Sequence, residues 1–179
     1  MNPPPRVLIF RGAPASGKGT LTQELCAQLP KPVALIEQDR FRWGVHVIGR
    51  SVPDISIEEH AFAHRNMKLI YEQYLQSGNY TIVLEGVFTW DAIAPDQGSA
   101  KELVALAKQH GFTCQSIVLK ASKQTLLNRN AKRPYSVPIV EFNTLYKNIY
   151  RTIDDSEIVV DSTGQDTGET IRTLKALLS

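Results

Sequence analysis

The residues with the clearest chemical pattern form the segment Gly12-Ala-Pro-Ala-Ser-Gly-Lys-Gly-Thr20. Its Gly-x4-Gly-Lys spacing follows an apolar run at 7–10 and precedes an amphipathic stretch at 21–29, which is the context of a P-loop. Glycines let several backbone N–H groups point at one anion, and the N-terminus of the next helix adds a positive dipole end. Lys18 would reach the β- and γ-phosphates as a point charge. The predicted nucleotide-binding residues of the loop are Gly12, Ala13, Pro14, Ala15, Ser16, Gly17, Lys18, Gly19 and Thr20.

The loop departs from the common pattern at one position. Gly19 follows the lysine where a serine or threonine is usual, and the hydroxyl comes one residue later, at Thr20. This Gly-Lys-Gly-Thr order resembles the loop of adenylate kinases and related nucleotide kinases. We therefore expect Mg²⁺ to be held by Thr20 or through water, and the sequence leaves both alternatives open.

A carboxylate that could act as a base follows the second predicted strand, Val33–Glu37. If this strand runs parallel to the first, Asp39 lies beside the P-loop, where it could accept the proton of an attacking hydroxyl. Arg42 could fix an anionic acceptor or the flank of the site. The alternative is that Asp39 caps a short helix and the nearby arginines are surface charges.

Arg129 and Arg133 are four residues apart in a predicted helix at 123–133, so we expect them on one helix face. Two guanidinium groups there could neutralise the charge of a transferring phosphoryl group, and Arg129 could also contact the nucleotide. The neighbouring lysines are expected to be solvated surface residues.

Glu85 ends the third predicted strand, where a carboxylate could orient Mg²⁺ through water, contact the acceptor or cap a turn. Asp161-Ser-Thr-Gly164 matches the Asp-x-x-Gly of GTPases only superficially, because no Asn-Lys-x-Asp follows it. The loop 162–165 is instead a candidate for contact with the nucleotide base.

Strand-like and helix-like segments alternate along the chain. Near-continuous apolar strands separated by helices predict an α/β fold, a three-layer P-loop NTPase fold with a five-stranded parallel sheet and helices on both faces. The ligand site is then expected outside the carboxyl ends of the strands. The remaining predicted elements are helix 57–76, strand 80–85, loop 89–99, helix 100–110, strand 112–119, helix 138–151, strand 157–161 and helix 169–178.

The bulk composition sets limits on the class of protein. The 179 residues, of which 42% are hydrophobic, predict one domain, 1–179, with a lid segment at about 122–138. A net charge of +2 is too small to indicate nucleic acid by itself. Cys26 and Cys114 predict neither a disulfide framework nor a zinc site. Without an apolar run of about 18 residues or a signal peptide, we expect a cytoplasmic protein with no membrane contact. His60 and His64 are expected to be core or solvated residues.

On these residues the chain resembles the P-loop kinases that include phage polynucleotide kinase, zeta toxins and chloramphenicol phosphotransferase. The likeness covers about 7–161 and rests on Asp39-x-x-Arg42, Lys132-Arg133, Val137-Pro138 and Leu145-Tyr-Lys147. The resemblance implies that Lys18 stabilises the phosphates, Asp39 is the base and Arg133 clamps the transition state. The turn Glu85-Gly-Val-Phe88 stands where polynucleotide kinases carry Asp and Asn in an acceptor-binding turn. This difference leaves the identity of the acceptor open.

Together these features predict an ATP- and Mg²⁺-dependent kinase that phosphorylates a hydroxyl of a small molecule or a nucleic-acid 5′ end. Asp39 is the predicted general base, and Arg42 and Glu85 are the predicted acceptor contacts. The alternatives are an ATPase that acts as a nucleotide-dependent switch, and a zeta-toxin-like kinase. No stable protein partner is indicated.

Overall fold

The computed structural model describes residues 6–44 and 56–178 and contains one five-stranded sheet in which every pairing is parallel. The strand order is β2-β3-β1-β4-β5, as in a P-loop NTPase fold. This confirms the predicted fold class. The strands are β1 (Arg6–Arg11), β2 (Val33–Glu37), β3 (Thr81–Gly86), β4 (Thr113–Lys120) and β5 (Ile158–Asp161).

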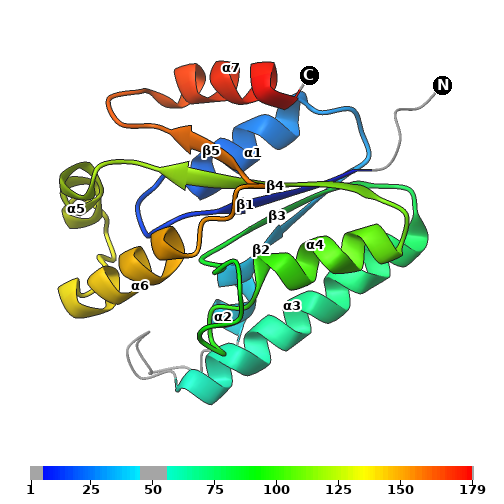
Figure 1. Cartoon of the computed structure of the whole chain (residues 1–179), viewed down its shortest axis with the longest axis horizontal. Coiled ribbons are helices and arrows are strands. Elements are labelled where there is room, and N and C mark those ends of the chain that lie inside the picture. The colour runs from blue at the N-terminus through cyan, green and yellow to red at the C-terminus, as the bar shows by residue number, and fades with distance from the viewer. Residues whose placement is uncertain (1–5, 45–55, 179) are drawn as a thin grey trace.

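Helices cover both faces of the sheet (Figure 1). On one face, α3 (Ile57–Ser77) and α4 (Ala100–Gln109) pack on Val7 and Ile9 of β1. On the other, α1 (Lys18–Gln28) and α7 (Thr167–Leu178) pack on Leu8 and Phe10. Successive side chains of a strand point to opposite faces, so the unbroken apolar run of β1 is what a strand buried on both faces requires.

Three further helices lie toward the carboxyl ends of the strands: α2 (Gln38–Gly44), α5 (Lys123–Ala131) and α6 (Ile139–Arg151). Phe142 of α6 and Leu126 of α5 pack on Ala13 of the P-loop in a small apolar cluster. These helices therefore form part of the wall around the loop, at the edge of the sheet where the site was expected.

Local signals set the ends of the longest helix. Ser56 accepts a hydrogen bond from the backbone of Glu59, whose side chain in turn accepts one from Ser56 N, so α3 begins with a capping box. Gly78, with φ +68°, ends the helix in the left-handed conformation that glycine adopts without strain.

One expectation needs correction. The helix expected at 123–133 ends at Ala131, so Arg133 lies beyond it and does not share a helix face with Arg129. The residue before a proline is disfavoured in the helical region, and Pro134 follows Arg133 directly. β2 is parallel to β1, but it pairs with β3, which separates the two strands. Asp39 therefore approaches the P-loop across the end of β3.

Candidate active site

The P-loop connects β1 to α1 in a tight turn. A Cβ on Gly12 would lie 2.5 Å from the backbone oxygen of Leu119, so glycine is required there by the close approach of β4. Gly17 has φ +89°, a conformation that favours glycine. The buried ammonium of Lys18 donates to the backbone oxygens of Gly12 and Ala13, at 3.0 and 3.2 Å. The loop thus curls back on its lysine.

Lys18 and Glu85 form a buried pair at the floor of the site. Nζ of Lys18 lies 3.8 Å from Oε1 of Glu85, and both side chains are buried. Burial lowers the pKa of Lys18, which Glu85 and then Asp39 oppose, while Arg133 and Arg42 lower it further. Burial raises the pKa of Glu85, and Lys18 opposes this shift. Glu85, at the end of β3, thus lies beside the lysine of the P-loop.

A cavity of about 880 Å³ opens above this pair. Pockets that bind small molecules or cofactors usually measure about 300–1,000 Å³, so this cavity lies toward the upper end of that range. Its residues come from the P-loop and the start of α1, the ends of β2 and β3, α2, α3, the loop after β3, α5, the segment 132–138 and α6. They are Pro14, Ala15, Gly17, Lys18, Gly19, Thr20, Glu37, Asp39, Arg40, Arg42, His60, Glu85, Val87, Asp96, Arg129, Arg133, Pro134, Tyr135, Ser136, Val137, Pro138, Glu141 and Leu145.

Asp39 lies in the first turn of α2, with its side chain 56% exposed. Nη1 of Arg42 is 3.5 Å from its Oδ1, a distance too long for a strong hydrogen bond. The neighbouring Gln38 is fully buried, where it donates to the backbone oxygen of Gln97 and accepts from the backbone N–H of Val87. Gln38 therefore anchors the start of α2 to the loop after β3 and holds Asp39 toward the cavity.

The two arginines of the predicted pair both line the cavity, although from different backbone settings. Nη2 of Arg129 donates to the backbone oxygen of Ser162 at 3.3 Å, which connects α5 to the loop after β5. Arg133 lies in the turn beyond α5 and is exposed. Arg129 is therefore fixed by the fold, whereas Arg133 has room to approach a ligand.

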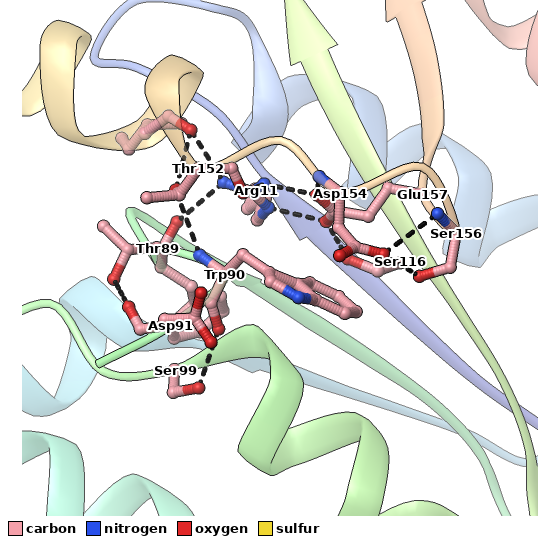
Figure 2. A network of polar contacts seen from close by, with 12 residues as sticks. Arg11, Thr89, Trp90, Asp91, Ser99, Ser116, Thr152, Asp154, Ser156 and Glu157 are labelled. Carbon is pink, nitrogen blue, oxygen red and sulfur yellow. Dashed lines mark hydrogen bonds and ion pairs between the residues drawn. The ribbon is translucent and has the colours of Figure 1, made fainter. Parts of the chain in front are cut away.

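Figure 2 shows a polar network around Arg11, at the end of β1. Arg11, the last residue of β1, is fully buried, and its Nε and Nη2 form an ion pair with Glu157. Its remaining N–H groups donate to the backbone oxygens of Phe88, Ile149 and Thr152, while Ser116 donates to Glu157. All five guanidinium donors are thus satisfied, and the end of β1 is connected to the turn after β3 and to the end of α6.

Several cavity residues had no sequence signal strong enough to identify them. Glu37 was assigned only to a strand, although its spacing from Asp39 places two carboxylates at the end of β2. His60 was expected to be a core or solvated residue, yet it is half-buried in the cavity wall. Asp96 and Glu141 lie 45 residues apart in the chain and meet only through the fold.

The site offers hard oxygen ligands of the kind that Mg²⁺ prefers: the Thr20 hydroxyl and the carboxylates of Glu37, Asp39 and Glu85. In the described part of the chain, no group of three or more acidic, histidine or cysteine side chains is arranged to hold a metal ion alone. Mg²⁺ in phosphate sites is usually held by one or two carboxylates together with waters and the phosphates themselves, so the residues present fit this ion.

A P-loop at the carboxyl ends of a 2-3-1-4-5 parallel sheet defines a nucleotide-binding α/β domain of the P-loop class. A family model for an AAA domain matches residues 7–148, and the chain belongs to this family. No curated protein matched the sequence in a comparison with such proteins.

Solved structures of similar fold include three proteins whose names describe kinases. A putative kinase from Chloroflexus aurantiacus is 23% identical, with a TM-score of 0.65 over 99% of this chain and 98% of that one. A sugar kinase from Janibacter sp. is 14% identical, with a TM-score of 0.65 over 98% and 95%. Shikimate kinase from Aquifex aeolicus is 16% identical, with a TM-score of 0.62 over 96% and 95%. At these identities the likeness shows the fold.

Within the described residues, none of the helices has both the length and the apolar character needed to cross a membrane.

Proposed function

We propose that the protein is a P-loop kinase that transfers the γ-phosphate of ATP to a hydroxyl of a small molecule, with Asp39 as the general base. The single observation that carries this proposal is the position of Asp39. Its exposed carboxylate lies in the same cavity as Lys18 and the two arginines, separated from the P-loop only by the end of β3. The names of the structural neighbours, which include sugar and shikimate kinases, support an alcohol as acceptor.

In this account the whole chain, 1–179, is one kinase domain, and the segment 122–138 is its lid. The P-loop amides and Lys18 bind the β- and γ-phosphates, and the N-terminus of α1 adds its dipole. Arg133, and Arg129 beside it, neutralise the charge that develops on the transferring phosphoryl group.

Asp39 accepts the proton of the acceptor hydroxyl as its oxygen bonds to the γ-phosphorus and the bond to the bridging oxygen of ADP breaks. The weak contact with Arg42 keeps the carboxylate oriented without occupying both of its oxygens. Mg²⁺, held by Thr20, by Glu85 through water and by the phosphates, would neutralise phosphate charge.

The test is to follow the γ-phosphate of isotopically labelled ATP in a panel of acceptors: nucleosides, 5′-hydroxyl oligonucleotides, aminoglycosides, phenicols and sugars. The proposal expects label in a phosphate ester of at least one acceptor and a decrease in ATP hydrolysis to free phosphate when that acceptor is present. Label that goes only to water with every acceptor, together with nucleotide-dependent capture of a partner, would instead indicate a nucleotide switch.

A further inference from the structure

The acceptor half of the cavity has an unequal balance of charge. Asp39 and Arg42 of α2, His60 of α3, Asp96 of the loop after β3 and Glu141 of α6 line it together. Arg42, Asp96 and Asp39 all influence the pKa of His60, and Arg42 and Asp96 influence the pKa of Glu141, so His60 and Glu141 both lie within electrostatic range of Arg42 and Asp96. These five side chains include three carboxylates and one permanent cation.

That cation already has protein partners. Nη2 of Arg42 donates to the backbone oxygen of Asp96 at 2.7 Å, and Nη1 faces Asp39 at 3.5 Å. Its side chain is only 16% exposed. Nε of Arg42 is buried without a hydrogen-bond partner among the described residues, but an anionic acceptor that used it would bring its negative charge beside Asp96 and Glu141. The geometry therefore assigns Arg42 to the flank of the site, where it positions Asp39.

Among the described residues, two of the carboxylates have no such partner. Within residues 6–44 and 56–178, the side chains of Asp96 and Glu141 make no hydrogen bond and no ion pair. Burial raises the pKa of Glu141, Arg42 opposes this shift and Asp96 adds to it. Because a carboxylate is stabilised in its ionised form by an adjacent positive charge, this wall favours a cationic ligand group.

The remaining wall is apolar. Val87 and Leu145 are buried in one cluster with Ile149, and the half-buried Val137 packs on it. Val87, Val137 and Leu145 also line the cavity, as do Pro138 and the exposed ring of Tyr135. A ligand that reaches from the carboxylates to this side would therefore contact hydrocarbon and one aromatic ring.

We propose that the acceptor is a small alcohol that carries a cationic amine and an apolar or aromatic body, and that phosphorylated or carboxylated alcohols and nucleic-acid 5′ ends are excluded. This inference rests on the proposed kinase function and names its substrate class. The acceptor hydroxyl loses its proton to Asp39 and forms a new bond to the γ-phosphorus, ADP leaves, and the amine stays unmodified beside Asp96 and Glu141.

Three probes of matched size and shape test the charge preference: phenylalaninol, which is cationic, 3-phenylpropane-1,2-diol, which is neutral, and 3-phenyllactate, which is anionic. Binding to the full-length protein saturated with Mg²⁺ and a non-hydrolysable ATP analogue would be measured by calorimetry or NMR titration. We expect phenylalaninol to bind about tenfold more tightly than phenyllactate, the effect of one charge-assisted hydrogen bond. Glu141→Gln should reduce this ratio severalfold, whereas Glu24→Gln, an exposed control on α1, should leave it unchanged.

Equal or tighter binding of the anion, no binding of any of the three probes, or an unchanged ratio in Glu141→Gln would overturn the inference. Phosphate transfer separates this inference from the proposed function. An anionic acceptor that is phosphorylated efficiently contradicts the charge preference and leaves the kinase intact. Conversely, if the cation binds preferentially and label still goes only to water from every acceptor, the charge preference stands and the kinase proposal fails.

Discussion

The imidazole of His64 fills the space in which a side chain at Gly98 would lie. A Cβ built on Gly98 would be 2.1 Å from Cε1 of His64, and Gly98 has φ +75°. The buried His64 of α3 thus packs against the loop 87–99. This loop places Asp96 in the cavity wall and provides the backbone oxygen of Gln97 that accepts a hydrogen bond from Gln38. The packing of α3 is thereby connected to the position of Asp39.

Gly98→Ala should therefore destabilise the protein by two separable effects. The positive φ contributes about 1–2 kcal/mol for a residue with a Cβ, and the clash with His64 contributes about 1–3 kcal/mol as overpacking. Urea unfolding measures the sum, and the double variant Gly98→Ala/His64→Ala isolates the clash. If Gly98→Ala has the same cost whether or not position 64 carries the ring, the proposed contact is wrong.

His64 also predicts a pH dependence of stability. Burial lowers its pKa below the usual histidine value of about 6.5, Glu102 opposes the shift, and nearby cations add to it. The unfolded chain therefore takes up this proton first as the pH falls. Stability should be fully present above about pH 6.5 and should fall toward the lower folded-state pKa, by at most about 1.4 kcal/mol per pH unit.

Urea unfolding of His64→Gln between pH 7.5 and 5.5 measures this contribution against the wild type. The variant should show a flatter decline, with a remainder because burial also lowers the pKa of His60. His110→Gln, which changes an exposed histidine, is the matched control. A decline of equal slope in His64→Gln and the wild type would show that His64 makes no such contribution.

The buried pair of Arg11 and Glu157 should be the most sensitive polar contact outside the cavity (Figure 2). Glu157→Gln keeps the size of the side chain but leaves the Arg11 cation buried without its counter-ion, a loss of about 3–5 kcal/mol. The control is Asp91→Asn, whose pair with Lys101 is exposed and should contribute less than about 1 kcal/mol. Similar unfolding midpoints for the two variants would contradict this ranking.

The P-loop hydroxyl at Thr20, one residue later than usual, predicts a specific dependence of activity on Mg²⁺. If Thr20 contacts Mg²⁺, Thr20→Ala should raise the Mg²⁺ concentration for half-maximal activity severalfold with little change in fold. A Cβ on Gly19 would meet nothing within 4 Å, so Gly19→Ser fits and should restore Mg²⁺ affinity in the Thr20→Ala background. An unchanged Mg²⁺ requirement in Thr20→Ala would assign the metal to water and carboxylates instead.

The sheet was predictable because its strands are short apolar runs buried on both faces, as Val7–Phe10 illustrates. The P-loop and the place of Asp39 in the same cavity were predictable because local spacing and the strand order indicate them. The predicted helix at 123–133 was two residues too long, because the helical spacing continues through Arg133. Pro134 is the sequence signal for the earlier end.

The acceptor wall and the network of Arg11 were not predictable in the same way. Asp96, Glu141 and Glu157 are single acidic residues without a local sequence pattern. Only the folded chain brings Asp96 and Glu141 to the cavity and Glu157 to Arg11. Gln38 has no signal in the sequence either, because its role depends on the carbonyl of Gln97, which the loop after β3 brings to it. Residues 45–55, which follow Asp39 and Arg42 in the chain, lie outside the described residues.

The central claim, that Asp39 is the base of a phosphate transfer, is tested most directly by comparing Asp39→Asn with wild type on the best acceptor. The account predicts a fall in kcat of about 10²- to 10⁴-fold, an unchanged dissociation constant for the ATP analogue, and wild-type activity in the exposed control Asp91→Asn. Phosphate transfer by Asp39→Asn at the wild-type rate would contradict the account.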